Sequence, residues 1–273
     1  MRQSNSLTKL VDTSIKKLNI KKLFIDSYEE KRTSSGFTNS DANTALKEKL
    51  EDGVLLINYT GHGGELGWTE EQVFTINDIK KMTNRNRLPL FMTATCEFSR
   101  FDNPEHKSAG EYLLTQEQGG AIGLFTTVRL VFSIPNFKLN ETFYKVLASS
   151  INNSEIRLGD VFKRTKVSNN GGTNDRNFTL LGDPALKLTF PLNNSVVDDI
   201  IINNQQSDTI KSLNEGVIRG HISNIKNDID NLIAEYPRTE LVNDKNGVLI
   251  NVLQKNSSID MFQENPIFII DPY

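Results

Sequence analysis

The chain has 273 residues, of which 37% are hydrophobic and 24% are charged, and its formal net charge at pH 7 is -3. This length is sufficient for one large domain and a smaller one, and a charge so close to balance argues against nucleic acid as a partner. No run of about 18 apolar residues suggests a transmembrane segment, and the single cysteine excludes both an internal disulfide and a multi-cysteine metal site.

The first stretch, residues 1–18, has the spacing of an amphipathic helix. It lacks the apolar centre and cleavage site of a signal peptide, so an export signal is expected either upstream of it or not at all. From there to about Phe190, short apolar runs alternate with amphipathic stretches, which predicts an α/β fold with a mostly parallel sheet flanked by helices. The expected strands span residues 20–26, 53–59, 88–95 and 119–126. The expected helices span residues 40–50, 75–82, 107–118 and 135–149.

The composition changes after Pro191, where Asn-rich and Asp-rich segments carry short alternating apolar runs and acidic residues outnumber basic ones. This pattern predicts a small β domain, in the form of a sandwich. We therefore divide the chain into an α/β domain, residues 1–191, and a β-rich domain, residues 192–273. The last apolar run, residues 266–273, is typical of a strand, so the second domain is expected to be C-terminally incomplete.

Two of the expected strands end in unusual sequences. The strand at 53–59 runs into GHGG, which places His62 among glycines, and the strand at 88–95 runs into the single cysteine, Cys96. Because the carboxyl ends of neighbouring parallel strands face one crevice, these two side chains are expected to lie side by side. Only the thiolate form of a cysteine attacks, and an imidazole can take the thiol proton. The pair therefore predicts nucleophilic chemistry at Cys96.

The glycines beside His62 are also expected to serve this chemistry, through the backbone. Residues without a Cβ allow a sharp turn and let backbone N–H groups face a developing oxyanion. The N–H groups of Gly63 and Cys96 are the candidate donors of this oxyanion hole, and Trp68 is expected to fix the loop.

Simpler interpretations exist for the same residues. A lone buried cysteine is commonly a small core hydrophobe. A glycine-rich loop after a strand can cradle a phosphate, although GHGGELGW lacks the Lys-Ser/Thr pair of a phosphate-binding loop. The other histidines, His106 and His221, are distant in sequence, so we expect no metal and no cofactor. The order and position of His62 and Cys96 favour the nucleophilic pair.

Four blocks carry a resemblance to a known family: NYTGHGGELGWTEE, LPLFMTATCEFSRFDNPEHKSAGE, GGAIGLFTTVRLVFSIPNFKLNETFY and FTLLGDPALKL. They resemble the gingipain family of the caspase-like clan and, within it, the sortases of type IX secretion. The resemblance implies a caspase-like sheet, a following β-sandwich, and cysteine-dependent hydrolysis or transfer of peptide bonds. It also implies substrates that bear a C-terminal sorting domain, other type IX secretion components as partners, and a location at the outer-membrane surface of the cell.

This resemblance also raises expectations for weaker candidates. Caspase-like sheets begin with a strand before the one expected at residues 20–26, so the first strand is expected to be missing here. The family uses an upstream acid to orient the histidine, and Asp26 is the candidate, with a cap or turn as the alternative. Thr127 and Arg129 follow the next strand, where the clan builds its specificity pocket, with a structural salt bridge as the alternative for Arg129.

Two other functions stay open on sequence alone. One is a gingipain-like secreted endopeptidase, and the other is a non-catalytic surface or assembly module that retains the fold. Hydrolysis and transpeptidation are not distinguished either, because the outcome depends on whether water or an amine reaches the acyl-enzyme first.

Overall fold

The computed structural model describes residues 2–15, 18–33, 36–69, 72–150, 156–169, 172–188, 190, 193–202, 204–209, 216–224, 248–250 and 267–271. The chain divides into two compact units. The first comprises Met1–Thr189 together with Glu264–Tyr273, and the second comprises Phe190–Gln263.

Six strands form the main sheet of the first unit, in the order β1-β15-β4-β8-β9-β10. They are β1 (Ile20–Phe24), β15 (Ile267–Asp271), β4 (Leu56–Thr60), β8 (Leu90–Ala94), β9 (Gly123–Thr127) and β10 (Phe178–Gly182). All neighbours are parallel except β9 and β10. The predicted α/β fold with a mostly parallel sheet is confirmed, and β10 is the antiparallel edge strand.

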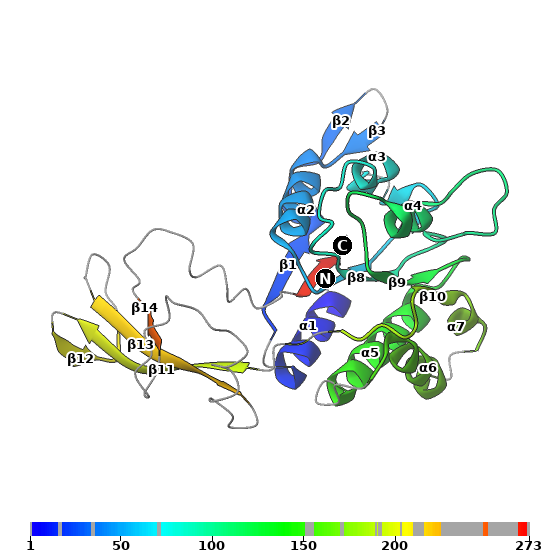
Figure 1. The fold of residues 1–273 in the computed structure, drawn as a ribbon. Coiled ribbons are helices and arrows are strands. Elements are labelled where there is room, and N and C mark those ends of the chain that lie inside the picture. The colour runs from blue at the N-terminus through cyan, green and yellow to red at the C-terminus, as the bar shows by residue number, and fades with distance from the viewer. Residues whose placement is uncertain are drawn as a thin grey trace. The chain divides into compact units, whose positions relative to one another are not determined.

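Helices cover both faces of this sheet (Figure 1). One face carries α1 (Arg2–Ser14), α5 (Ser133–Ser150), α6 (Leu158–Asn169) and the short α7 (Thr173–Arg176). The other carries α2 (Ser40–Asp52), α3 (Ile76–Ile79) and α4 (Ala109–Thr115). None of the helices in the described part of the chain combines the length and apolar character needed to cross a bilayer.

Shorter elements complete the first unit. A 3₁₀ turn, η1 (Ile25–Ser27), follows β1, and β2 (Lys31–Thr33) pairs with β3 (Gly36–Thr38) as a hairpin. A small antiparallel sheet contains β5 (Gly63–Gly64), β6 (Gly67–Trp68) and β7 (Phe74–Thr75). This small sheet begins directly after His62, so it shapes the loop that carries the candidate base.

Local sequence sets where the helices begin. The side chain of Asn39 accepts a hydrogen bond from the Ala42 N–H at 3.1 Å, which caps α2. Capping boxes start α3, through Thr75 and Asp78, and α4, through Ser108 and Glu111. Because each cap is encoded within four residues, these three helices begin close to the predicted positions.

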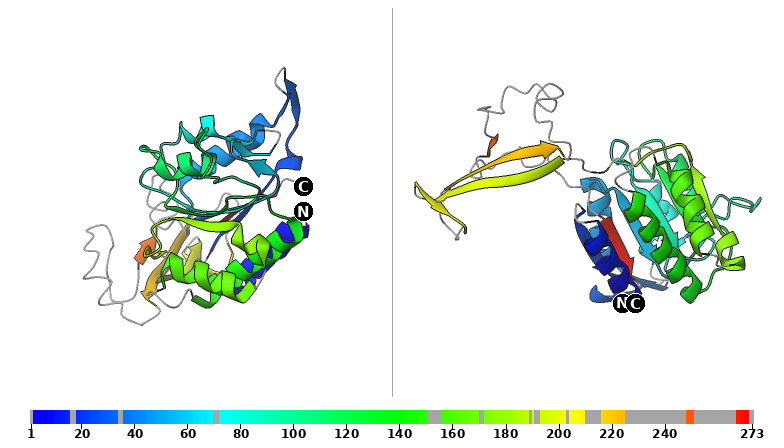
Figure 2. Two further views of the ribbon diagram at one scale, coloured as in Figure 1. Left: turned by 90° about the vertical axis from the view of Figure 1, so that its right-hand side faces the viewer. Right: turned by 90° about the horizontal axis from the view of Figure 1, so that it is seen from below.

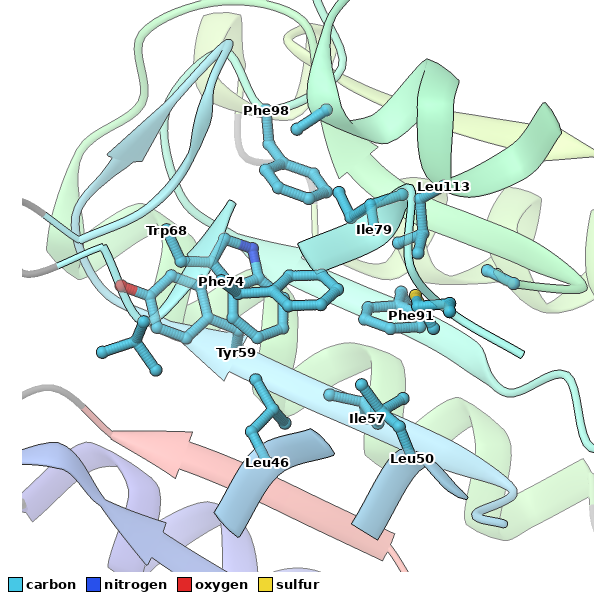
Figure 3. Packing of buried hydrophobic residues seen from close by; sticks show 14 of the residues in the cluster. Leu46, Leu50, Ile57, Tyr59, Trp68, Phe74, Ile79, Phe91, Phe98 and Leu113 are labelled. Carbon is cyan, nitrogen blue, oxygen red and sulfur yellow. The ribbon is translucent and has the colours of Figure 1, made fainter. Parts of the chain in front are cut away.

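The core beneath α2, α3 and α4 centres on Trp68 (Figure 3). The Trp68 ring stacks on Tyr59 with 4.3 Å between centroids, and its centroid lies 4.8 Å from Phe74 and 5.8 Å from Phe98. All four side chains are fully buried. Aromatic burial of this kind ties the loop after β4 to the segment after β8.

The second unit contains β11 (Asn193–Ile202), β12 (Gln205–Ser207), β13 (Gly216–Asn224) and β14 (Val248–Ile250). They form one antiparallel sheet in the order β12-β11-β13-β14. Its described residues thus have the predicted β character. The second layer of the predicted sandwich falls outside the described residues.

Strand β15 differs from the prediction. The sequence analysis assigns residues 192–273 to the second domain, but β15 lies between β1 and β4 and is parallel to both (red in Figure 2). The boundary near Pro191 agrees with the division at Phe190, whereas the assignment of residues 264–273 is wrong. An apolar run predicts a strand without specifying its partner. The apolar run of residues 266–273 thus contributes a strand to the sheet of the first unit.

Candidate active site

The pairing of β4 with β8 brings the two candidate catalytic residues to one edge of the sheet. The two strands run parallel with Thr60 opposite Ala94, and the Gly61 N–H continues the pairing by donating to the Ala94 carbonyl at 3.5 Å. His62 and Cys96 each follow two residues after the Thr60–Ala94 pair. Both therefore lie at the same level, at the carboxyl ends of adjacent strands, as predicted.

The backbone of His62 is fixed from two directions. Its carbonyl accepts a hydrogen bond from the Tyr59 hydroxyl at 2.5 Å and another from the Thr69 N–H at 3.0 Å. Trp68 stacks on Tyr59 and so supports the first of these bonds. The His62 side chain is exposed. These contacts hold the backbone of the His62 loop, and the predicted role of Trp68 in the loop fits them.

Gly63 brings the histidine loop into direct contact with the residue before the thiol. A Cβ at position 63 would lie 2.5 Å from Oγ1 of Thr95 and 3.0 Å from the carbonyl oxygen of Gly67. The first distance is shorter than real Cβ contacts and the second is tighter than most of them, so a side chain at residue 63 would force Thr95 or the loop to shift. The loop can therefore approach Cys96 because residue 63 has no side chain.

The chain turns sharply at Cys96. The following residue, Glu97, has φ +51°, a left-handed conformation that is strained for a residue with a Cβ. The Glu97 N–H donates to the Arg129 carbonyl at 3.4 Å, and the Ser99 N–H donates to the Thr127 carbonyl at 2.9 Å. The partly buried thiol of Cys96 lies 3.6 Å from the Val131 carbonyl oxygen. The turn thus holds the sulfur between the ends of β8 and β9.

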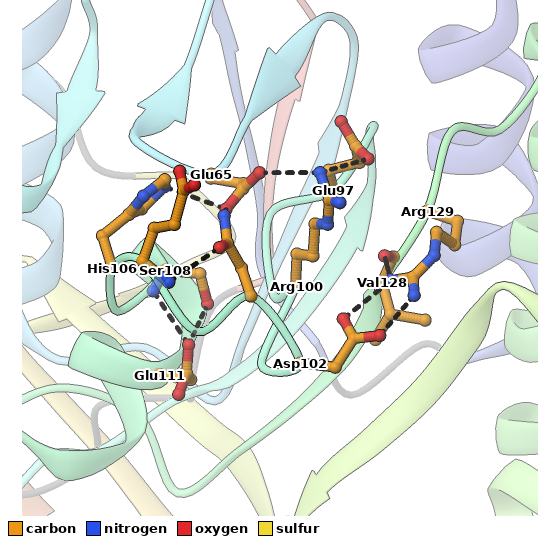
Figure 4. A network of polar contacts seen from close by, with 11 residues as sticks. Glu65, Glu97, Arg100, Asp102, His106, Ser108, Glu111, Val128 and Arg129 are labelled. Carbon is orange, nitrogen blue, oxygen red and sulfur yellow. Dashed lines mark hydrogen bonds and ion pairs between the residues drawn. The ribbon is translucent and has the colours of Figure 1, made fainter.

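A polar network connects the two loops (Figure 4). The carboxylate of Glu65 accepts from Arg100 Nη1 at 3.1 Å and from Asn103 Nδ2 at 2.7 Å, and it lies 2.9 Å from His106 Nε2. The backbone carbonyl of Glu65 accepts from the Ala109 N–H at 2.7 Å. Glu65 was not among the residues predicted from sequence. Its only local signal is an acidic side chain three residues after His62.

Arg129 pairs with Asp102 through both guanidinium Nη atoms, which is the salt-bridge alternative stated for it. This hydrogen bonding lowers the pKa of Asp102 to about 2. Both side chains are about half exposed. Thr127, the other pocket candidate, is fully buried and its hydroxyl donates to the Thr95 carbonyl. Thr127 therefore belongs to the packed interior and does not line an open pocket in this structure.

Asp26 is not brought to His62. It is exposed in η1, after β1, and β15 lies between β1 and β4. Neighbouring strands are about 4.8 Å apart, which separates β1 from β4 by about 10 Å. The exposed position of Asp26 suits the cap or turn alternative. Among the described residues, no group of three or more His, Cys, Asp or Glu side chains could hold a metal ion.

Comparison with known proteins identifies similar sequences. The family model described as peptidase family C25 matches residues 2–189. Lys-gingipain HG66 of Porphyromonas gingivalis is 31% identical over 101 residues, which are 37% of this chain and 5% of that protein. Gingipain R2 of the same species is 37% identical over 49 residues, which are 18% of this chain and 6% of that protein. The matched regions thus span only a small part of these relatives.

Solved structures show a weaker similarity. The Arg-specific cysteine proteinase gingipain R aligns with a TM-score of 0.48 at 18% identity, over 66% of this chain and 42% of that chain. A complex of the pro- and mature domains of RgpB from Porphyromonas gingivalis also aligns with a TM-score of 0.48, at 16% identity. That alignment covers 66% of this chain and 53% of that chain.

Proposed function

Because the chain belongs to peptidase family C25, we propose that it is a cysteine endopeptidase in which Cys96 is the nucleophile and His62 is the base. The observation that supports this proposal is the register of β4 and β8, which ends both strands at one level, so that His62 and Cys96 each follow two residues after the same backbone pair. A thiol and an imidazole at one edge of a sheet are the two groups that acyl transfer requires.

The reaction follows from these two groups. His62 takes the thiol proton, and the thiolate of Cys96 attacks the scissile carbonyl carbon to give a tetrahedral oxyanion. The C–N bond then breaks, and the protonated His62 returns the proton to the departing amine. Water cleaves the resulting thioester to complete hydrolysis, or an amine attacks it to complete transpeptidation; in both cases His62 takes the proton of the acceptor and the Cys96 thiolate leaves. The His62 imidazole is exposed, so either water or an amine can reach it.

The backbone near the dyad supplies the electrostatic part of the mechanism. The N–H groups of Gly63 and Cys96 are the donors that we assign to the oxyanion. Gly63 lies against Thr95, the residue before the nucleophile, so both donors belong to one compact region. Donors that are fixed before the reaction stabilise the developing charge without reorganisation, and one such donor contributes roughly 10²–10³ in rate.

The finer proposal is that the protein is a sortase that removes C-terminal sorting domains at the outer-membrane surface. The four sequence blocks that resemble type IX secretion sortases support it. The charges near the nucleophile also support it, because Glu97 is paired with Arg100 and Asp102 is paired with Arg129. Asp102 is therefore already neutralised by Arg129, which disfavours a basic substrate side chain as its partner, whereas Arg100 is shared between Glu97 and Glu65.

Exposed apolar side chains beside the nucleophile support the same specificity. Leu130, Phe132 and Ile134 are 63%, 73% and 79% exposed, and they flank Val131, whose carbonyl contacts the Cys96 thiol. We propose that a peptide bound at the thiol contacts these side chains. Burial of apolar surface stabilises such a complex by roughly 25 cal/mol for each Å². We therefore assign an apolar rather than a basic side chain to the substrate next to the scissile bond.

The test uses the full chain and two kinds of substrate. One is a folded C-terminal sorting domain with its preceding linker, and the other is a set of short peptides cleaved after Arg or Lys. Cleavage of the linker, with little turnover of the basic peptides and none by the Cys96→Ala variant, is the expected result. Efficient cleavage of the basic peptides with no cleavage of the linker would reject the sortase and leave the gingipain-like endopeptidase. Inactivity toward both, with no labelling of the thiol, would favour the non-catalytic module.

A further inference from the structure

We infer that Glu65 is a positioning residue, which holds the loop of His62 against the segment that follows Cys96 and so sets the separation of imidazole and thiol. The inference rests on the proposed function of the His62–Cys96 pair. It concerns how the pair is held together, which the chemistry of the two residues does not explain.

The position of Glu65 in the chain makes it a link between the two loops. It follows His62 by three residues, and its side-chain partners Arg100 and Asn103 follow Cys96 within the same segment. Both carboxylate oxygens are engaged, Oε1 by Arg100 and Oε2 by Asn103 and His106. The carboxylate is therefore fixed in orientation as well as in position.

The two loops meet on both sides of the candidate dyad. On one side, Gly63 lies against Thr95, which directly precedes the nucleophile. On the other side, Glu65 binds Arg100, which also contacts Glu97, directly after the nucleophile. A displacement of the His62 loop is opposed at both points. Loss of the Glu65 side-chain contacts leaves the contact of Gly63 with Thr95 and the hydrogen bond from the Ala109 N–H to the Glu65 carbonyl.

The burial of Glu65 makes the contact strong. Its side chain is 14% exposed, whereas the side chains of Arg100 and His106 are 38% and 43% exposed. The carboxylate has thus lost most of its water and depends on these partners for its hydrogen bonds. Replacement by glutamine keeps the size of the side chain and one acceptor oxygen, but it puts an amide N–H₂ in place of the other oxygen, where it cannot accept a hydrogen bond. Glu65→Gln should therefore loosen the loop without opening a cavity.

The test measures alkylation of the thiol by iodoacetamide, which reports Cys96 alone because the chain has a single cysteine. At pH 9.5 an unassisted thiol is largely ionised, since its ordinary pKa is about 8.5, so the rate reports access to the sulfur. At pH 7 the rate depends on help from the imidazole. We expect Glu65→Gln to lower the pH 7 rate by about tenfold or more and the pH 9.5 rate by less than about twofold.

Three variants make the measurement decisive. His62→Ala gives the full loss of assistance at pH 7. Asp78→Asn is the matched control, because Asp78 is 13% exposed and ion-paired with Lys47 at 2.7 Å, but belongs to the cap of α3. Arg100→Gln removes the ion pair between Glu65 and Arg100 by changing the more exposed residue of the pair. It is used in place of Glu65→Gln if the Glu65→Gln variant does not fold. We expect Arg100→Gln to lower the pH 7 rate and Asp78→Asn to leave it unchanged.

The outcomes separate this inference from the proposed function. If His62→Ala lowers the pH 7 rate but Glu65→Gln and Arg100→Gln do not, the positioning role is rejected and the dyad stands. If Asp78→Asn lowers the rate as much as Glu65→Gln, the effect is general destabilisation and the positioning role is again rejected. If His62→Ala itself has no effect, the dyad fails and the inference fails with it.

Discussion

At the scale of single residues, the approach of the histidine loop to the nucleophile depends on Gly63. The space that a Cβ would need is already occupied by the Thr95 hydroxyl and the Gly67 carbonyl. The neighbouring Gly64 has no atom within 4 Å of the place where its Cβ would be. A Cβ would therefore clash at residue 63 but not at residue 64, so the two adjacent glycines can be compared within the same loop.

We predict that Gly63→Ala lowers kcat by about 10²-fold or more, because the added methyl group displaces the loop and the proposed oxyanion donor. Gly64→Ala should change kcat by less than about twofold, since a methyl group fits there without displacing the loop. Steady-state kinetics on the linker substrate measures both. Equal losses in the two variants would show that the turn tolerates no side chain anywhere, and the specific contact with Thr95 would not be the cause.

Residue-scale features were predictable from sequence where the signal is local. His62 and Cys96 each follow an apolar run directly, so their place at strand ends could be predicted from neighbouring residues. The partner of Arg129 could not, because Asp102 lies 27 residues away in the chain. The contacts of Glu65 with Arg100 and Asn103 were missed for the same reason, since they depend on where the two strands end in space.

At the scale of elements, the small sheet β5-β6-β7 supports the histidine loop from the core. Trp68 in β6 pairs with Gly63 in β5 and with Phe74 in β7. Its ring stacks on Tyr59, whose hydroxyl holds the His62 carbonyl. The Trp68 side chain therefore couples the packing of the core to the geometry of the His62 loop.

Replacing Trp68 by alanine should lower the free energy of unfolding by about 3–5 kcal/mol, because a fully buried aromatic side chain leaves a cavity. Phe37→Ala is the control, since Phe37 is 52% exposed and its loss should change the free energy by about 0.5 kcal/mol or less. Urea denaturation followed by circular dichroism measures both. A decrease of less than about 1 kcal/mol in the free energy of unfolding for Trp68→Ala would contradict the central place of Trp68 in the core.

The elements differ in how well sequence alone predicts them. Strands β4, β8 and β9 and helices α2 and α5 coincide with the expected segments to within a few residues, because apolar runs and caps mark them. Helix α6 was not predicted. It carries only four buried positions, Leu158, Val161, Thr165 and Asn169, two of which are polar. A helix whose buried stripe is partly polar gives a weak periodic signal.

At the scale of the whole molecule, the first unit is completed by a segment from the other end of the chain. Strand β15 pairs with β1 from Ile267 to Asp271 and with β4 from Ile267 to Ile270. β4 ends two residues before His62, the candidate base. This strand is hydrogen-bonded on one side to β15 and on the other to β8. Sequence indicated a strand here but not its partners, because the pairing joins residues that are far apart in the chain.

Removal of residues 264–273 should destabilise the first unit, because β1 and β4 both lose the backbone hydrogen bonds that β15 provides. We expect faster amide hydrogen exchange in β1 and β4, with little change in β9 and β10. Removal of residues 272–273 alone, which leaves β15 intact, is the control. A synthetic peptide spanning residues 264–273 should restore protection when added to the shortened chain. Unchanged exchange in β1 and β4 after the larger deletion would contradict the pairing.

The family and the fold class were the most predictable properties of the molecule. The sequence resemblance to gingipains is confirmed by the match to peptidase family C25 over residues 2–189. The glycine-flanked histidine and the cysteine at strand ends are what the proposed chemistry requires, so they are visible in sequence. The place of β15 and the links between the loops arise from packing, and they needed the structure.

The central claim is that His62 activates Cys96 for attack on a carbonyl. The most direct measurement is the rate at which a peptidyl acyloxymethyl ketone with leucine next to the reactive group labels the chain at pH 7, with the modified residue mapped by mass spectrometry. We predict labelling at Cys96 in the unmodified chain, none in Cys96→Ala, and a rate lowered by about 10²-fold or more in His62→Ala. Labelling of Cys96 at an unchanged rate in His62→Ala, or labelling that persists in Cys96→Ala, would contradict the account.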